Sequence, residues 1–261
     1  MMPDDPKTLT QRQFGTHAEG YVSSRTHAEG ETLIRLIEMV DPQPGWRALD
    51  IATGGGHTAL AIARRGTWTV AGDLTEPMLH AARKHITAQA PSGRVVYMRL
   101  DAEQLPFASN TFDAVTCRIA PHHFPDVAAF VRETARVVRP GGVVGIVDQL
   151  SPPDPKTAKY VNAFERLRDP SHVWAYNQVE WEGFLVGAGL EVLHVETFLT
   201  EHALTPWAER MGCDTATITR LRALLVQAPE PAAEWMRPII PGTADAVFVI
   251  RQFLMVGRKR P

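Results

Sequence analysis

The stretch ALDIATGGGHTALAIARR, residues 48–65, combines a short apolar strand, a glycine-rich turn and a helix. The strand ends at Asp50, three glycines follow at 54–56, and the helix begins near His57. Consecutive glycines between a strand and a helix permit backbone dihedrals that other residues avoid, and they let a ligand approach the main chain closely. The stretch therefore predicts a ligand-binding turn. A tight turn without a ligand is the simpler alternative.

The composition favours one sizeable globular domain, since 44% of the 261 residues are hydrophobic and 21% are charged. The net charge of -2 argues against nucleic-acid binding, which needs clustered Lys and Arg. There is no signal-peptide pattern at the start and no apolar run of membrane-spanning length. The two cysteines, Cys117 and Cys213, lack metal-ligand spacing, so no metal is expected and a reducing compartment fits. We expect a soluble cytoplasmic protein, and a homodimer is compatible with the sequence.

From Trp46 onward, strand and helix patterns alternate with short connections. This alternation predicts an α/β fold with a doubly wound parallel sheet and helices on both faces. In such sheets the ligand binds at the carboxyl ends of the strands. The predicted strands are 46–51, 67–73, 94–100, 112–119 and 142–149, and the predicted helices are 57–65, 76–89 and 126–138.

The segments on either side of this cofactor-binding core, 46–149, are predicted to cover it within a single domain spanning 1–261. Residues 1–10 are expected to be disordered, and 11–40 to form an N-terminal helical cap. Three prolines in SPPDPK, 151–156, end the regular alternation. After them we expect helices over 157–187 and 202–237 and strands over 187–198 and 246–259. Helical elements at 150–186 and 200–240 are the candidates for a lid.

Two classes of ligand fit the glycine turn: a dinucleotide pyrophosphate and a nucleoside without a phosphate. A dinucleotide fingerprint has a third glycine inside the helix, where Ala59 stands in this chain. Asp50 directly precedes the turn, and its negative charge would repel a pyrophosphate but attract an ammonium group. These residues favour a cationic ligand over a dinucleotide.

Two further carboxylates end the next two strands. Asp73 can accept hydrogen bonds from both hydroxyls of a ribose. Its alternative role is to cap the following helix, for which Thr75 is at least as good a residue. Asp101, or the amides after it, can meet the exocyclic amine of an adenine, and capping a short turn is the alternative. Ribose and adenine sites on neighbouring strands form a consistent row.

Five motifs in order resemble those of class I S-adenosylmethionine-dependent methyltransferases: ALDIATGGGHTA, GDLTEPML, RLDAEQLPF, FDAVTCRIAPHHF and VVRPGG. Within that family the chain is similar to small-molecule methyltransferases related to those of ubiquinone and menaquinone biosynthesis. The resemblance covers roughly residues 12–200. It implies a Rossmann-like, seven-stranded sheet, mostly parallel, with an antiparallel final hairpin in which the strand at 246–259 fits.

The resemblance also implies S-adenosyl-L-methionine as cofactor and S-adenosyl-L-homocysteine as product. One position departs from the family pattern, because Ala52 replaces the first glycine of acidic-x-G-x-G-x-G. Its small methyl group is expected to be tolerated. The resemblance places the methionine moiety against Asp50 and the backbone of Ala52, Thr53, Gly54 and Gly56. It places the ribose against Asp73, Leu74 and Met78, and the adenine against Asp101 and Ala102. Arg118 would lie at the floor of the site.

Methyl transfer from a sulfonium needs alignment, desolvation and a nucleophile in the correct protonation state. If a base takes part, His123 and His122 are the candidates, because they follow the fourth strand and histidine titrates near neutrality. A loop histidine bonded to the backbone is the alternative for either residue. Tyr21 and Arg25 lie four residues apart on one helical face, where Arg25 could meet the cofactor carboxylate and Tyr21 an apolar edge.

The lid segment DPSHVWAYN suggests a pocket for an apolar or aromatic substrate, with ordinary packing as the alternative. Its candidate substrate-binding residues are His172, Trp174 and Tyr176. The sequence thus predicts a methyltransferase acting on an oxygen, nitrogen or carbon of a small organic molecule. The alternatives are a non-catalytic S-adenosylmethionine-binding regulatory protein and a nicotinamide-dependent oxidoreductase.

Overall fold

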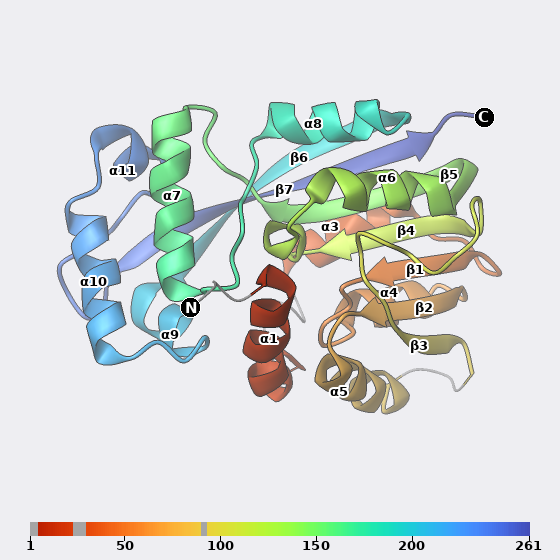
Figure 1. Ribbon diagram of the computed structural model, residues 1–261, viewed down its shortest axis with the longest axis horizontal. Coiled ribbons are helices and arrows are strands. Elements are labelled where there is room, and N and C mark those ends of the chain that lie inside the picture. The colour runs from red at the N-terminus through yellow and green to blue at the C-terminus, as the bar shows by residue number, and fades with distance from the viewer. Residues whose placement is uncertain (1–4, 23–29, 90–92) are drawn as a thin grey trace.

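A seven-stranded sheet organises the chain, in the order β3-β2-β1-β4-β5-β7-β6. The computed structural model describes residues 5–22, 30–89 and 93–261, with the side chains of 16–22 excepted. Strand β7 runs antiparallel to both of its neighbours, whereas the pairings among β1 to β5 are parallel. The strands are β1 (Arg47–Ile51), β2 (Trp68–Asp73), β3 (Val95–Arg99), β4 (Phe112–Arg118), β5 (Val138–Gln149), β6 (Leu190–Ala203) and β7 (Val247–Lys259). The predicted α/β sheet with an antiparallel final hairpin is confirmed (Figure 1).

Helices cover both faces of this sheet because side chains alternate along each strand. Leu49 of β1 faces the cluster that contains Phe130 of α6 and Trp181 of α8. Ala48, one residue earlier, faces the opposite cluster, which contains Leu36 of α3 and Ile62 of α4. These helices are α3 (Glu31–Val40), α4 (His57–Ala63), α5 (Glu76–Thr87), α6 (Val127–Val137) and α8 (Gln178–Gly187).

A third hydrophobic cluster lies at the far ends of β6 and β7, which extend beyond the other strands (Figure 1). Phe248 of β7 packs there against Phe164 and Trp207. The helices of this helical subdomain are α7 (Pro155–Arg168), α9 (Leu204–Glu209), α10 (Thr215–Val226) and α11 (Glu230–Met236). Pairing of β6 with β7 continues to Ala203↔Val247, so β6 ends beyond the residue 198 expected from the sequence.

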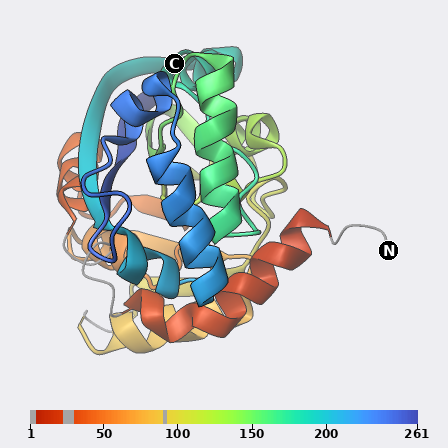
Figure 2. The same ribbon diagram turned by 90° about the vertical axis from the view of Figure 1, so that its left-hand side faces the viewer.

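The N-terminal region differs from the expectation of one helical cap over 11–40. Helix α1 (Pro6–Val22) begins at Pro6, so the prediction of disorder over 1–10 is wrong for residues 6–10. Helix α3 is a separate element that buries Leu33, Leu36, Ile37 and Val40 and packs on β5 and β7. Helix α1 packs instead on α5 and lies between α5 and the helical subdomain (Figure 2).

The lid region also differs in detail, because the expected helix over 157–187 is two helices. Helix α7 ends at Arg168 and α8 begins at Gln178, with a loop of non-helical residues between them. In the described part of the chain, no helix is both long and apolar enough to cross a membrane.

Candidate cofactor and acceptor site

A cavity opens where β1, β2 and β4 end and β3 leads into Asp101. This is the sheet edge at which ligands of doubly wound folds bind. The predicted residues that line it are Asp50, Ala52, Thr53, Gly54, Asp73, Leu74, Met78, Asp101, Ala102, Arg118 and His123. Residues far apart in the sequence are thus brought together around one space.

The backbone of the glycine turn adopts the left-handed conformation at three alternating positions. The φ angle is 52° at Ala52, 53° at Gly54 and 81° at Gly56. Ala52 therefore occupies a conformation that favours the glycine of the family pattern, at a cost of about 1–2 kcal/mol. Gly56 lies outside the cavity lining, and a Cβ there would stand 2.9 Å from Ile86 Cδ1. Glycine is therefore required at position 56 both by the packing of the turn on α5 and by the positive φ angle there.

Asp50 lies at the base of the turn and is almost completely buried. Its carboxylate accepts hydrogen bonds from Thr53 Oγ1 at 2.7 Å and Thr116 Oγ1 at 2.8 Å. Burial raises the pKa of Asp50 to about 6, although these hydroxyls and the charge of Arg118 act in the opposite direction. The site therefore holds a poorly solvated negative charge that a cationic group would stabilise.

Asp73 connects the glycine turn to the start of α5. Its Oδ2 accepts a hydrogen bond from Gly54 N at 3.0 Å, and its Oδ1 accepts one from Thr75 N at 2.9 Å. Burial raises the pKa of this carboxyl. Asp73 therefore bonds the first residues before α5 and also lines the cavity, and its contact with a ribose stays a prediction.

Helix α1 covers the cavity and contributes lining residues that the sequence did not single out: Lys7, Thr10 and Phe14. Lys7 Nζ lies 2.6 Å from Asp101 Oδ2 and 2.5 Å from Glu103 Oε2. The Phe14 ring packs edge-on against His123, with ring centroids 4.8 Å apart. Helix α1 therefore contacts both the Asp101 end and the His123 end of the cavity. Because this segment was expected to be partly disordered, no signal in the sequence indicated these contacts.

Arg118 lines the cavity at the end of β4. Its Nε donates to Thr58 Oγ1 at 3.2 Å, and its Nη1 donates to Thr32 Oγ1 at 3.5 Å. Burial lowers the pKa of Arg118 to about 10, and the charge of Asp50 opposes this change. The next residue, Ile119, has a φ of 55°, an unusual conformation for a β-branched side chain. The cavity thus contains a buried cation beside a strained strand end.

The two adjacent histidines have different surroundings in η1 (Pro121–His123). His123 lines the cavity, and its Nδ1 lies 3.1 Å from Ser171 O and 3.2 Å from Ser171 Oγ. Burial and the neighbouring His122 lower the pKa of His123 to about 3. His122 lies outside the lining and bonds Asp148 Oδ1 through Nδ1 at 2.5 Å. Burial opposes its charge, but Asp148 outweighs burial and raises the pKa of His122.

The three residues predicted to bind substrate do not line this cavity. His172 Nε2 bonds Asn162 Oδ1 at 2.8 Å, and Trp174 N donates to His122 O. Tyr176 packs edge-on against Phe184 at a centroid distance of 5.0 Å. Their substrate contact stays a prediction. The side chain of Tyr21 and the whole of Arg25 lie outside the described residues, so their cofactor contacts also stay predictions.

Three carboxyl and hydroxyl residues near the histidines were not foreseen: Asp148, Asp169 and Ser171. Asp148 stands near the end of β5, and the reasoning applied to Asp50, Asp73 and Asp101 would have identified it. Asp169 and Ser171 lie in the loop after α7, within a segment that the sequence predicted to be mostly helical. No sequence pattern indicated that this loop reaches His123.

Comparison with known proteins relates the whole chain to methyltransferases. Residues 49–146 match a family model described as a methyltransferase domain. The uncharacterized methyltransferase YcgJ of Bacillus subtilis is 32% identical over 248 residues, covering 95% of this chain and 98% of that protein. The demethylmenaquinone methyltransferase of Clavibacter sepedonicus is 34% identical over 140 residues, covering 54% of this chain and 56% of that enzyme.

A solved structure extends this relationship to the fold. The crystal structure of BH2331 from Bacillus halodurans is similar with a TM-score of 0.83 and 33% identity, over 88% of this chain and 99% of that chain. The seven-stranded sheet, the glycine turn after β1 and the carboxylates at or near the ends of β1, β2 and β3 agree with the family motifs found in the sequence. The chain belongs to the class I S-adenosylmethionine-dependent methyltransferase family.

Proposed function

We propose that this methyltransferase acts in the cytoplasm on a small organic molecule whose accepting atom is positioned by His123. The observation that carries the proposal is the burial of His123, which is only 7% exposed and lies under Phe14 of α1. A small molecule can be enclosed at such a place, whereas a folded protein or a duplex nucleic acid could not bring its main chain there. The net charge of -2 also disfavours a polyanionic substrate.

The residues of the cavity fit S-adenosylmethionine in one direction. Asp101 and Ala102 would border the adenine, and Asp73 would accept the ribose hydroxyls. At the other end, Asp50 would attract the ammonium group and Arg118 the carboxylate of the methionine moiety. When bound there, the cofactor supplies an electrophilic methyl group on a sulfonium. Family membership thus favours the nucleoside over the dinucleotide as the ligand of the glycine turn.

His123 is uncharged before the acceptor binds, and it can orient that acceptor. With a pKa of about 3 it is neutral throughout the physiological range, so one ring nitrogen is free of a proton. That nitrogen can accept a hydrogen bond from a hydroxyl or amine and so align its lone pair with the methyl group. Burial under α1 excludes water from this step.

The experiment is a methyl-transfer assay with purified protein, methyl-labelled S-adenosylmethionine and a panel of phenols, quinols, amines and carboxylic acids. We expect label in at least one small molecule, with one S-adenosylhomocysteine released for each methyl transferred. Label found only in added protein or nucleic acid would contradict the proposal.

His123→Ala is expected to lower turnover while leaving the Kd for S-adenosylhomocysteine nearly unchanged in calorimetry. Equal turnover in both proteins would remove the assignment of His123.

A further inference from the structure

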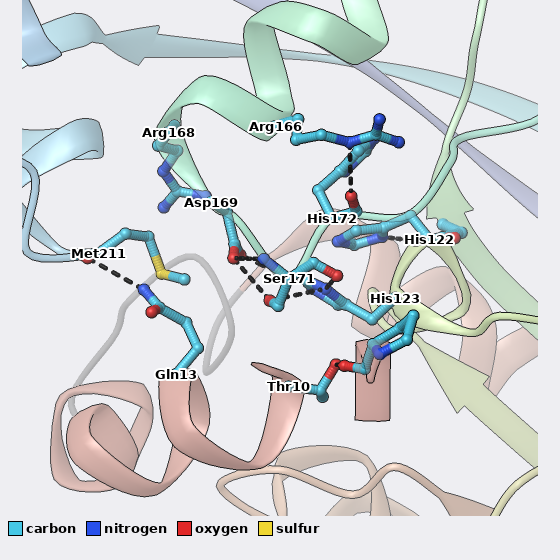
Figure 3. A network of polar contacts seen from close by, with 12 residues as sticks. Thr10, Gln13, His122, His123, Arg166, Arg168, Asp169, Ser171, His172 and Met211 are labelled. Atoms are coloured by element: carbon cyan, nitrogen blue, oxygen red, sulfur yellow. Dashed lines mark hydrogen bonds and ion pairs between the residues drawn. The ribbon is translucent and has the colours of Figure 1, made fainter. Parts of the chain in front are cut away.

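The loop that follows α7 lies directly over His123 (Figure 3). Within it, Asp169 Oδ1 accepts hydrogen bonds from Ser171 N at 2.9 Å and Ser171 Oγ at 2.6 Å. Asp169 is 4% exposed and Ser171 is 2% exposed, so water does not compete with these contacts. The Ser171 hydroxyl proton is therefore committed to Asp169, and the oxygen of that hydroxyl can only accept a further hydrogen bond.

This arrangement determines which nitrogen of His123 carries the proton. His123 Nδ1 faces Ser171 O at 3.1 Å and Ser171 Oγ at 3.2 Å. A carbonyl oxygen cannot donate, and the hydroxyl has already given its proton to Asp169. The contacts are favourable only if Nδ1 is the donor, so the neutral ring carries its lone pair on Nε2.

Asp169 also faces that second nitrogen. Its Oδ2 lies 4.0 Å from His123 Nε2, too far for a hydrogen bond but close enough to stabilise a positive charge on the ring. The other charged or titratable groups acting on His123 are His122, with ring centroids 4.1 Å away, and Arg168 at the end of α7, and both oppose protonation. On the α1 side the ring meets Phe14, which is uncharged. Asp169 is thus the carboxylate placed to balance a protonated His123.

We propose that Asp169 and Ser171 are positioning residues that hold His123 ready to receive a proton at Nε2, and that the acceptor is therefore a neutral hydroxyl or amine. The inference rests on the proposed function. The acceptor oxygen or nitrogen bonds the methyl carbon while the carbon–sulfur bond breaks and its electron pair stays on sulfur. The proton of the acceptor passes to Nε2, the imidazolium faces Asp169, and the proton passes to solvent after the product has left. A carboxylate acceptor has no proton to release and would not need this arrangement.

The first test reads the tautomer without any substrate. Nitrogen-15 NMR of full-length protein labelled at its ten histidines, with the His123 signals identified by their loss in His123→Gln, distinguishes protonated from unprotonated ring nitrogens. We expect a protonated Nδ1 and an unprotonated Nε2 in the wild type. In Ser171→Ala we expect the same tautomer with a shifted Nδ1 signal, because only the main-chain carbonyl of residue 171 still accepts from Nδ1. Ser171→Thr keeps the hydroxyl and is expected to restore the wild-type Nδ1 signal. The reverse tautomer in the wild type would overturn the inference.

The matched control for the serine is Ser151→Ala. Ser151 is equally buried at 2% exposed, but its hydroxyl accepts a hydrogen bond from Asn162 and makes no contact with His123. The His123 signals are expected to stay unchanged in this variant. If Ser151→Ala disturbed them as strongly as Ser171→Ala, the effect would be one of general packing and the inference would fail.

The second test uses the acceptor found by the methyl-transfer assay. Asp169→Asn keeps an oxygen for Ser171 but removes the charge, so we expect kcat to fall about tenfold or more with KM and the Kd for S-adenosylhomocysteine little changed. Asp154→Asn, the same change at the exposed N-cap of α7, is the control and should leave kcat unaltered. An unchanged kcat in Asp169→Asn would overturn the role of Asp169. If no small molecule is methylated, the proposed function fails, while the NMR result still decides whether the loop holds the tautomer.

Discussion

Asp50 carries a buried carboxyl group whose charge opposes the stability of the fold. In the folded protein burial raises its pKa from 3.8 to about 6, so the folded state holds this proton more tightly than the unfolded chain. The contribution of Asp50 therefore makes the fold less stable as the pH rises from about 4 to about 6, and above that range the buried charge costs roughly 3 kcal/mol. A bound ammonium group would offset this cost.

We predict that Asp50→Asn stabilises the unliganded protein at pH 7.5 by about 1–3 kcal/mol, because the substitution removes the buried charge. The same variant should bind S-adenosylmethionine about tenfold more weakly, or worse, since the attraction for the ammonium is lost. Urea unfolding at pH 5 and pH 7.5, with calorimetry for binding, measures both effects. If the free energies of unfolding of the wild type and the variant differed by the same amount at both pH values, the charge of Asp50 would not be the cause of the difference in stability.

Asp73 is expected to act on the cofactor directly. Asp73→Ala should weaken the binding of S-adenosylhomocysteine at least tenfold, about 1.4 kcal/mol, because it removes the ribose acceptor and the partner of Gly54 N. Calorimetry measures this change. Asp214→Ala, at the exposed N-cap of α10, is the control and should bind normally. An unaltered Kd in Asp73→Ala would refute the ribose assignment.

At the scale of elements, close packing of α3 on the sheet depends on Gly145 in β5. A Cβ at this position would lie 2.6 Å from both Leu36 Cδ1 and Val40 Cγ2. We predict that Gly145→Ala destabilises the protein by about 1–3 kcal/mol, because α3 must shift away from the sheet. The measurement is the free energy of unfolding in urea.

The control for this substitution is Gly183→Ala in the exposed part of α8. No atom lies within 4 Å of a Cβ built there, so alanine should stabilise the helix by about 0.5–1 kcal/mol. If both glycine substitutions changed stability in the same direction, packing of α3 on Gly145 would not explain the result.

At the scale of the molecule, α1 contacts both the loop after β3 and the helical subdomain. It contacts Asp101 and Glu103 after β3 through Lys7, and the helical subdomain through Gln13, whose Nε2 donates to Met211 O at 3.0 Å. A ligand in the cavity beneath α1 would therefore stabilise the sheet and the helical subdomain together. Binding to the folded state alone raises the apparent stability by mass action.

We predict that S-adenosylhomocysteine at about 100 times its Kd stabilises the protein by about 2.7 kcal/mol. For a chain of this size the corresponding rise in Tm is roughly 5–10 °C. Thermal unfolding followed by circular dichroism measures the shift, and Asp73→Ala at the same ligand concentration should show much less of it. A ligand-independent Tm in the wild type would contradict binding in this cavity.

The sheet and several of the side chains that line the cavity could be predicted from the sequence. Apolar strands alternating with helices leave few ways to bury their faces, so the parallel part of the sheet followed from the pattern, and the antiparallel end was implied by the family motifs. Asp50, Asp73 and Asp101 were found because the ends of parallel strands meet at one edge, and each residue stands at or near the end of its strand. Each of these carboxylates lies close in the sequence to the strand that positions it, so the spacing of residues along the chain is enough to predict its place.

The tertiary structure was needed to see what covers the cavity and how the surroundings of His122 and His123 differ. Lys7 contacts Asp101, and Ser171 contacts His123, across long separations in sequence. Such contacts depend on long-range packing, which the hydrophobic periodicity of a short segment does not reveal. His122 and His123 are neighbours in the chain, yet Asp148 raises the pKa of one while burial lowers that of the other. The chemistry of these side chains depends on the charges and the burial that the fold places around them, which is why their roles could not be separated from the sequence.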